Sequence, residues 1–413
     1  MTIDLTAHIR PGDTVLVGQG AGEPRALVEA LLEQRHAVGP LTVFVGGTNS
    51  GLWQPEHADV LRFIGFGAIG RTAALTRAGV LDVLPVHLGS LPYLFTSRTI
   101  PIDVVLCLVS TADDDGRHSL GLVADYVPAA IATARTTIAE VNPHVPYTFG
   151  ATIDANDKRL VTVPDDRPLA SVKRRVPSDQ DRAIAAHVAA LVPDGATMQF
   201  GVGGTPDAVL AALGDKHDLG VHSGLISDAV FDLVEAGVVT NARKPIDTGL
   251  TVTGAVVGTE RLYRWAHLNP SLLMRPVSYT HNPQVLSSFD NFFAINAAIE
   301  VDLGGQINAE TVNGTYIGAV GGQGAFARAG AAAPHGRSVI ALPSTAAGGA
   351  ISRIVARLSD AVTSTPRADA DLVVTEHGVA DLRGATLRQR AERLIAVADP
   401  SHRDALRRDL AAR

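Results

Sequence analysis

The strongest constraint on the fold is a local plan that the chain uses twice, about 180 residues apart. Residues 11–32 read PGDTVLVGQGAGEPRALVEALL, and residues 193–213 read PDGATMQFGVGGTPDAVLAAL. Each copy has an acidic turn, a short apolar stretch, a glycine-rich bend, a proline and an amphipathic run of Ala, Leu and Val. Such a repeat indicates that one α/β unit occurs twice.

Further segments follow the two copies in the same order. GPLTVFVGG at 39–47 and HDLGVHSG at 217–224 come directly after the helical stretches, and PIDVVLCLVSTADDDG at 101–116 matches DADLVVTEHGVADLRG at 369–384 more loosely. Short apolar strands that alternate with helical stretches favour parallel sheets with crossover helices. We therefore expect an α/β protein of two similar open domains, each with a mainly parallel sheet flanked by helices.

The charged segment 165–183, DDRPLASVKRRVPSDQDRA, is the predicted linker between the domains. A chain of 413 residues is longer than one ordinary core supports, so two domains are expected on length as well. We place the domains at 1–180 and 181–413, and the second contains most of the site motifs described below.

Composition excludes several classes of function. Hydrophobic residues make up 46% of the chain and charged residues 19%, which is typical of a compact protein. The net charge is −7 and no long basic run occurs, so nucleic-acid binding is not expected. The single cysteine, Cys107, lies in the apolar run VVLCLVS and is expected to be buried. The histidines lack the close pairs of a zinc site, so no metal is expected.

The N-terminal sequence MTIDLTAHIRPGD lacks a basic segment followed by an apolar one. No apolar stretch approaches the roughly 20 residues that a membrane-spanning helix needs. We expect a cytoplasmic protein with no membrane partner.

The glycine-rich bends GQGAGEP and GVGGTPD could aim backbone N–H groups at an anion. Both lack the glycine in sixth place that a dinucleotide fingerprint requires, and neither ends in the Gly-Lys-Ser/Thr of a nucleoside-triphosphate loop. Neither kind of nucleotide binding is therefore favoured.

The segment GVHSG places polar side chains at the end of a predicted strand, where clefts form in α/β enzymes. Its serine, Ser223, is fourth, whereas the serine of a hydrolase nucleophile elbow is third, which argues against a triad nucleophile. His222 is a candidate general base. The alternative is a structural histidine that backbone carbonyls satisfy.

Two later segments also contain candidate site residues. AAIEVDLGGQINAETVNG at 297–314 sets Glu310 among small and amide side chains. GAVGGQGAFARAG at 318–330 has Gly321, Gly322 and Gln323, which suit a backbone nest for a developing oxyanion. The alternative for the glycine pair is an ordinary turn.

Together these motifs resemble the acetyl-CoA hydrolase/transferase family, which includes 4-hydroxybutyrate and succinyl-CoA:acetate CoA-transferases. The resemblance covers most of the chain and is found in FGVGGTPDAVLAAL, LGVHS, LYRWAHLNP, INAAIEVDLGGQINAE, GAVGGQ, ALPSTA, SRIV, VVTEHGVADLRG, RAERLIAVADP and, in the first half, AEVNPHVP. It implies two α/β domains with acyl-CoA bound between them, a carboxylate or other acyl acceptor, and a homodimer. It also implies a set of residues for binding substrate and coenzyme A: Gln19, Gly201, Gly203, Gly204, Asn282, Gly321, Gly322 and Gln323.

One departure from the family changes the expected chemistry. Family transferases usually read Gly-x-His-Ser/Thr-Glu-x-x-x-Asp where this chain reads GVHSGLISD, and that glutamate attacks the thioester to form first an anhydride and then a glutamyl-CoA thioester. The matching residue here is Gly224, which has no carboxylate. Ala325 and Ser278 stand where the family usually has Asp, and Gln19 stands where several transferases have His.

Three hypotheses follow. In the one that we favour, the chain hydrolyses acyl-CoA or transfers its acyl group directly, with His222 or Glu310 as general base and residues 321–323 as oxyanion site. In the second, Glu310 takes over as the nucleophile of a CoA-transferase, since AETVNG is similar to the Ser-Glu-Asn-Gly segment of other CoA-transferase families. In the third, the chain is a non-catalytic acyl-CoA-binding or partner subunit.

Overall fold

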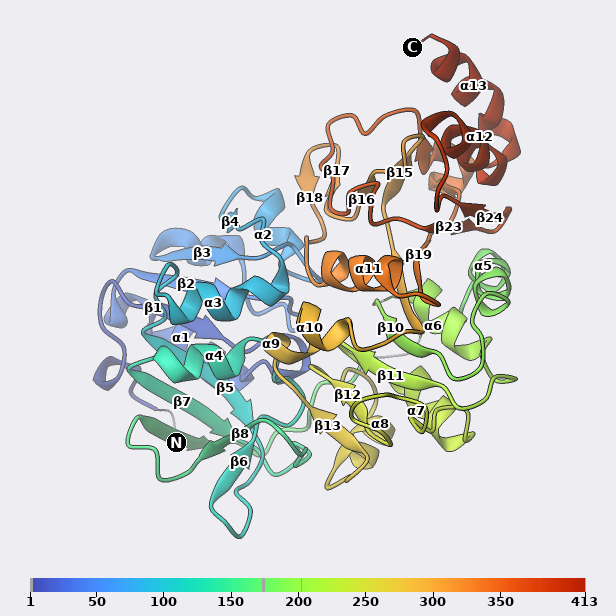
Figure 1. The fold of residues 1–413 in the computed structure, drawn as a ribbon. Helices are drawn as coiled ribbons and strands as arrows, with labels where there is room; N and C mark the ends of the chain where they lie inside the picture. The colour runs from blue at the N-terminus through green and yellow to red at the C-terminus, as the bar shows by residue number, and fades with distance from the viewer. Residues whose placement is uncertain (1–2, 173–174, 202, 413) are drawn as a thin grey trace. The chain divides into compact units, whose positions relative to one another are not determined.

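The computed structural model describes residues 3–172, 175–201 and 203–412, and they form two compact units (Figure 1). The first unit comprises Met1–Lys173, Val252–Thr280 and Thr315–Gly321, and the second Arg174–Thr251, His281–Gly314 and Gly322–Arg413. Each unit therefore combines three separate stretches of the chain, whereas the sequence predicted a single boundary near residue 180. The physical reason is local backbone pairing, because Ala124 N–H donates to the carbonyl of Gly254 and Val256 N–H donates to that of Leu122.

The first unit has one parallel sheet in the order β4-β3-β2-β1-β5-β7-β9. The apolar runs predicted as strands form its centre, and the six residues of β5, which include Cys107, are all buried. The strands of this sheet are β1 (Thr14–Val17), β2 (Leu41–Val45), β3 (Leu61–Gly65), β4 (Leu81–Val83), β5 (Val104–Val109), β7 (Thr136–Val141) and β9 (Leu160–Pro164).

Helices cover both faces of this sheet. The apolar side of α1 (Arg25–Val38) buries Leu27, Val28 and Leu31 in a core with the sheet, while α4 (Val127–Thr133) packs on β5 and on α3 (Leu91–Thr96). The remaining elements of the first unit are β6 (Arg117–Ser119), β8 (Thr152–Asp154), β12 (Thr251–Thr253), β13 (Leu272–Met274), β18 (Thr315–Tyr316), α2 (Ala73–Arg77), α8 (Glu260–Ala266) and α9 (Val277–Thr280).

Within the second unit the sheet runs β11-β10-β14-β19-β23-β24, with parallel neighbours except for the antiparallel pair β23–β24. This arrangement confirms the predicted α/β class with mainly parallel sheets. The strands are β10 (Thr197–Phe200), β11 (Gly220–Ser223), β14 (Phe292–Ala297), β19 (Arg337–Ala341), β23 (Leu372–Thr375) and β24 (Gly378–Asp381).

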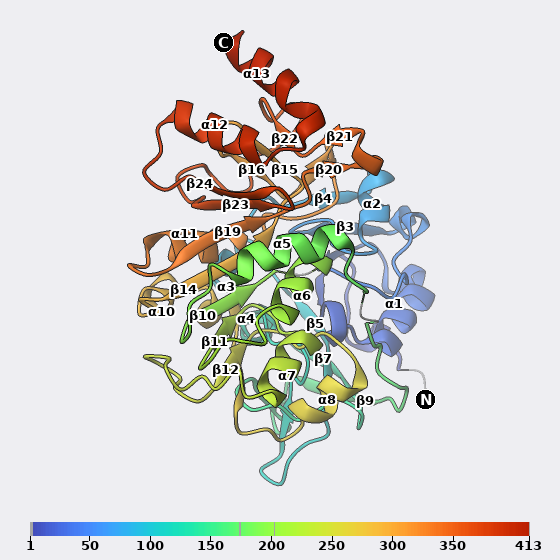
Figure 2. The ribbon, with the colours of Figure 1, turned by 90° about the vertical axis from the view of Figure 1, so that its right-hand side faces the viewer.

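Helices flank this sheet on both sides as well. In Figure 1, α10 (Pro283–Leu286) and α11 (Gln323–Ala332) lie on one side of β10 and β11, and Figure 2 looks onto α5 (Asp179–Ala189), α6 (Gly204–Ala211) and α7 (Asp228–Glu235) on the other. The remaining elements of the second unit are β15 (Glu300–Asp302), β16 (Ile307–Asn308), β17 (Thr311–Val312), β20 (Thr345–Ala346), β21 (Ile351–Ser352), β22 (Ile354–Val355), α12 (Leu387–Val397) and α13 (Arg403–Ala411).

The two sheets share the duplicated plan. In the first unit β1 lies between β2 and β5, and in the second β10 lies between β11 and β14. The predicted match of 101–116 with 369–384 is therefore wrong: β5 has the position of β14, whereas β23 has that of β9. A buried strand followed by an acidic turn is a local pattern, and it does not specify which strand pairs with which.

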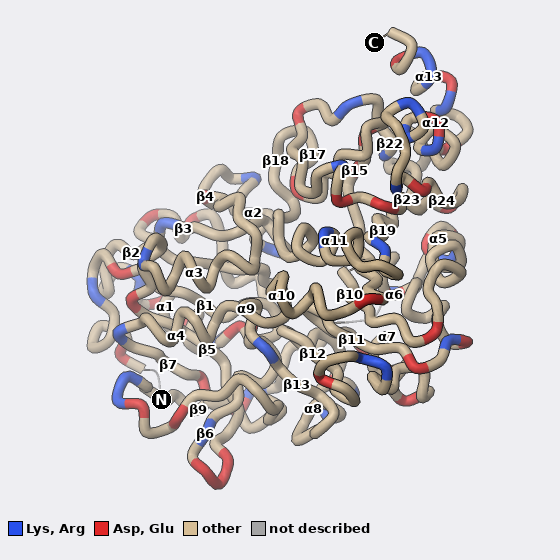
Figure 3. Tube along the Cα trace, viewed as in Figure 1, with Lys and Arg blue, Asp and Glu red and all other residues tan. Residues whose placement is uncertain are grey.

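Charged residues of both signs are scattered, as expected for a chain without a long basic run. Lys and Arg are scattered among Asp and Glu along the traces of both units (Figure 3), in a chain whose net charge is −7. Of the helices that the structure describes, none combines the length and the apolar character needed to cross a bilayer.

Candidate active site

The end of β11 directs its two polar side chains to opposite faces of the sheet, because side chains alternate along a strand. Ser223 points toward β10, where its Oγ lies 3.3 Å from the amide N of Phe200 and 3.4 Å from the Phe200 carbonyl oxygen. His222 is on the opposite face, fully buried, with its ring centroid 5.0 Å from that of Phe289. Gly224 follows on the same side as His222. Ser223 thus holds β11 to β10, and this geometry disfavours it as a nucleophile paired with His222.

The imidazole of His281 fills the space beside Gly224. A Cβ built on Gly224 would lie 3.2 Å from Cε1 and 3.5 Å from Nε2 of His281, and a Cβ built on Gly322 would lie 2.1 Å from that Nε2. The ring of His281 packs on Phe326 of α11 with the centroids 4.4 Å apart. Sequence reasoning missed His281, although it singled out Ser278 and Asn282 on either side of it.

His281 is a neutral imidazole at physiological pH. Burial disfavours the charged ring, and the neighbouring His222 adds to this effect, so the pKa of His281 is lowered from 6.5 to about 3. The site around Gly224 therefore contains two buried histidine rings and phenylalanine side chains.

The glycine pair after residue 320 leads into α11. Gly321 has a left-handed backbone with φ of +55°, and Gly322 is the N-cap residue of α11. Gln323, the first residue of the helix, donates from Nε2 to Thr365 Oγ1 at 3.2 Å. The first N–H groups of a helix have no intrahelical acceptor, so the start of α11 offers donors directly beside His281.

Glu310 lies between β16 and β17 and is 3% exposed. Its N–H donates to Asn308 Oδ1 at 3.0 Å, and the N–H of Ala309 donates to Ser364 Oγ at 2.8 Å. Gln323 donates to Thr365, the residue after Ser364, so the backbone just before Glu310 and the side chain of Gln323 contact the same short segment.

The second glycine bend connects β10 to α6. Gly203 has φ of +126°, which favours glycine, and it is the N-cap residue of α6, while Gly201 donates its N–H to the Ile295 carbonyl. A Cβ on Gly204 would lie 3.4 Å from Cδ and Nη1 of Arg175. The guanidinium group thus lies at the N-terminus of α6, and both features favour an anion. Asn282 is the N-cap residue of α10, where its side chain accepts a hydrogen bond from the N–H of Gln284.

Gln19 makes its contacts inside the first unit. Its Nε2 donates to Asp125 Oδ2 at 2.6 Å, and its Oε1 accepts from the N–H of Gly47 at 3.1 Å. Burial raises the pKa of Asp125 to about 7. The adjacent Tyr126 hydroxyl is buried and finds no hydrogen-bond partner in the described ranges, so a polar cluster lies at the carboxyl ends of β1 and β2.

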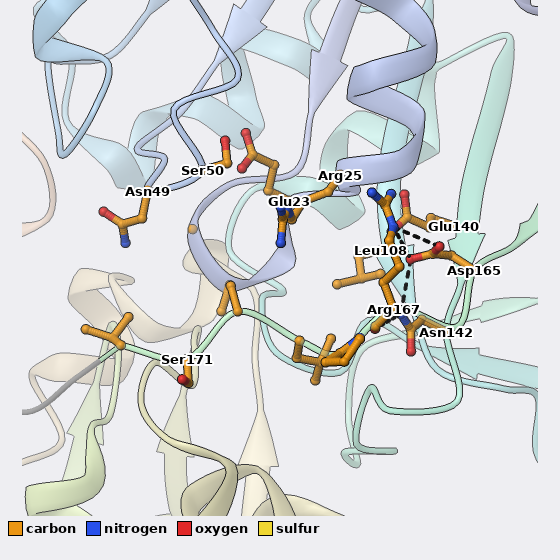
Figure 4. Close-up of a pocket in the computed structure, with 16 residues that line it drawn as sticks. Glu23, Arg25, Asn49, Ser50, Leu108, Glu140, Asn142, Asp165, Arg167 and Ser171 are labelled. Atoms are coloured by element: carbon orange, nitrogen blue, oxygen red, sulfur yellow. Dashed lines mark hydrogen bonds and ion pairs between the residues drawn. The ribbon is translucent and has the colours of Figure 1, made fainter.

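A cavity of about 250 Å³ lies elsewhere in the first unit (Figure 4). Arg167 forms ion pairs with Glu29 and Asp165 there. Burial raises the pKa of the nearby Glu140 to about 7. The cavity lies beyond β5 and β7 at the start of α1 and is lined by Gly20, Ala21, Glu23, Arg25, Asn49, Ser50, Leu108, Glu140, Asn142, Asp165, Arg167, Pro168, Leu169, Ala170, Ser171 and Val172.

The described parts of the chain contain no group of three or more His, Cys, Asp or Glu side chains placed to bind a metal ion.

Comparison with known proteins shows the class of protein to which this chain belongs. Two family models match, the acetyl-CoA hydrolase/transferase N-terminal domain over residues 2–173 and its C-terminal domain over residues 258–410. The 4-hydroxybutyrate coenzyme A transferase of Clostridium kluyveri is 37% identical over 398 residues, which cover 95% of this chain and 92% of that protein.

Solved structures agree with the sequence comparison. The crystal structure of RipA from Yersinia pestis superposes with a TM-score of 0.94 at 34% identity, over 99% of this chain and 95% of that one. A 4-hydroxybutyrate CoA-transferase from Porphyromonas gingivalis superposes with a TM-score of 0.82, also at 34% identity and with the same coverage.

The fold and the comparisons thus define an α/β protein of the CoA-transferase class. More particularly, the chain belongs to the acetyl-CoA hydrolase/transferase family, as its motifs predicted.

Proposed function

We propose that this chain is an acyl-CoA thioester enzyme that works without a glutamyl-CoA intermediate. The observation that carries the proposal is the environment of residue 224: the residue is glycine, and the imidazole of His281 fills the adjacent space. Water or a second substrate then attacks the thioester carbonyl directly.

His222 acts as the general base in this mechanism. It lies on the same side of β11 as Gly224, within the electrostatic reach of His281. As the oxygen of water bonds to the acyl carbon, its proton passes to the imidazole of His222. The C–S bond then breaks, and the same proton passes to the thiolate, which leaves a carboxylic acid and coenzyme A.

Backbone N–H groups at the start of α11 stabilise the oxyanion. Gly321, Gly322 and Gln323 form this segment, and oxyanion donors of this type typically contribute about 10²- to 10³-fold to a rate. The glycine bend at Gly203 and Gly204, with Arg175 beside it, is suited to a phosphate group of coenzyme A. We retain the expectation of a cytoplasmic homodimer that uses small acyl-CoA substrates.

The alternative is a CoA-transferase in which Glu310 is the nucleophile. The observation in its favour is that Glu310 is buried and follows Ala309, whose N–H donates to Ser364, next to the Thr365 that Gln323 contacts. The two functions differ in their products. Each acyl-CoA of a panel is incubated with protein and labelled free carboxylate, and both free thiol and labelled acyl-CoA are measured.

Release of thiol without label exchange is the expected result. Exchange with ping-pong kinetics would instead identify a transferase. Tight acyl-CoA binding with neither product would identify a non-catalytic binding subunit.

A further inference from the structure

The His281 ring occupies a space that two glycines create. Gly224 at the end of β11 and Gly322 at the start of α11 both lie against it, and a Cβ at either position would press on the imidazole. The closer contact is at Gly322, where only 2.1 Å would separate the added Cβ from Nε2. The Nε2 edge of the ring is therefore the edge that faces the N-terminus of α11.

Packing fixes the ring in this orientation. His281 is 4% exposed, its plane is tilted by 50° to that of Phe326, and Phe326 also packs near Phe292 with the ring centroids 6.3 Å apart. A side chain that is fixed by aromatic neighbours loses little further freedom when it contacts a ligand, which is the condition for preorganised stabilisation of a transition state.

The protonation state limits what this ring can do. Because its pKa is lowered to about 3, His281 is uncharged during turnover and a weak proton acceptor. A neutral imidazole nevertheless has one N–H group that can donate a hydrogen bond. With the proton on Nε2, that group would extend the row of N–H donors at the start of α11.

We propose that His281 is a catalytic residue that donates a hydrogen bond from Nε2 to the thioester oxygen, together with the first N–H groups of α11. The proposal rests on the proposed function, because it names a second histidine role at the same site. His222 moves the proton, whereas His281 polarises the carbonyl and transfers none. The two roles separate because the environment keeps His281 neutral.

Two substitutions at His281 test this role. Phe keeps an aromatic ring against Phe326 but removes both nitrogens, and Gln supplies an amide N–H group near the position of Nε2. We expect His281→Phe to lower kcat for thioester hydrolysis by about 10²- to 10³-fold with little change in KM. His281→Gln should recover at least tenfold of that loss. His36→Gln, at an exposed histidine of α1 in the first unit, is the control.

A spectroscopic measurement does not depend on turnover. A ketone analogue of the acyl-CoA, with CH₂ in place of sulfur, is bound to each variant, and the carbonyl stretching frequency is recorded by infrared difference spectroscopy. We expect a shift to lower frequency in the wild-type protein that decreases in His281→Phe and partly returns in His281→Gln.

Two results would overturn the role of His281: a kcat within threefold of wild type in His281→Phe, or a Gln variant as slow as the Phe variant while both remain folded. An unshifted carbonyl in the wild-type protein would overturn it as well. If the ketone shift follows the prediction while no acyl-CoA is turned over, then the donor role stands and the proposed function fails.

Discussion

Gly224 and His281 share one space, since a Cβ on Gly224 would approach Cε1 of the His281 ring to 3.2 Å. A side chain at residue 224 therefore requires the His281 ring to shift, and a long acidic side chain competes with the imidazole for this space. The identity of residue 224 is thus coupled to the position of the His281 ring.

This coupling predicts the behaviour of Gly224→Glu. The new side chain must displace the imidazole from a close-packed position, and overpacking of a core typically costs about 1–3 kcal/mol of unfolding free energy. We expect a lower melting temperature and no exchange of labelled acetate into acetyl-CoA. The double variant Gly224→Glu with His281→Ala should recover stability and gain exchange.

Gly214→Ala is the matched control for that experiment, because a Cβ at Gly214 would meet no atom within 4 Å. Acetate exchange by Gly224→Glu alone, at an unchanged melting temperature, would show that the two side chains do not compete.

His222→Gln should lower kcat for hydrolysis by about 10²- to 10⁴-fold, because general base catalysis typically contributes that much. Glutamine is chosen over alanine because His222 is fully buried and packs against Phe289, so that truncation would leave a cavity. Thiol release measures the rate, and calorimetry reports whether the variant is folded. A folded variant with a rate within threefold of wild type would exclude His222 as the base.

Glu310→Gln distinguishes a hydrolase in which His222 is the general base from a transferase in which Glu310 is the nucleophile. If His222 is the base, the amide should reduce hydrolysis by less than tenfold, and peptides that contain residue 310 should have no acyl or coenzyme A adduct. Digestion of the wild-type protein after acyl-CoA treatment, followed by mass spectrometry, provides this readout. Complete loss of activity together with an adduct on Glu310 would support the transferase.

The contribution of Asp125 and Glu140 to stability should fall as the pH rises from about 4 to about 7. Burial raises the pKa of Asp125 from 3.8 to about 7 and that of Glu140 from 4.5 to about 7. In that window the folded state keeps protons that the unfolded chain has released, so the free energy of unfolding decreases as the pH increases. Each pKa unit corresponds to roughly 1.4 kcal/mol.

The Asp125→Asn variant isolates one of these groups. Relative to wild type, its free energy of unfolding in urea should increase as the pH is raised from 4.5 to 8. A difference that is independent of pH would mean that Asp125 has the same pKa in the folded and unfolded chain.

The fold was largely predictable because its signals are local. The apolar runs at residues 14–17 and 197–200 and the glycine bends that follow them indicated strands and parallel crossovers, and the structure has both. Strand neighbours were less predictable: β14 rather than β23 takes the place that β5 has in the first unit. Pairing depends on contacts far apart in sequence, which local patterns do not encode.

The candidate site was predicted in part. His222 was identified because it lies at the end of a predicted strand, and Gly224 because of the resemblance to the family. His281 precedes a four-residue helix almost sixty positions after His222 and shows no pattern of its own. Arg175 was missed for a similar reason, since it lies within the charged segment 165–183, which predicted only a linker. Only the folded chain places them beside Gly224 and Gly204.

Intact-protein mass spectrometry combined with a free-thiol assay, during turnover of a panel of acyl-CoA thioesters, tests direct attack on the thioester most immediately. The account predicts steady release of coenzyme A from protein whose mass does not change. A protein that gains the mass of coenzyme A through a thioester on one of its own carboxylates would contradict it.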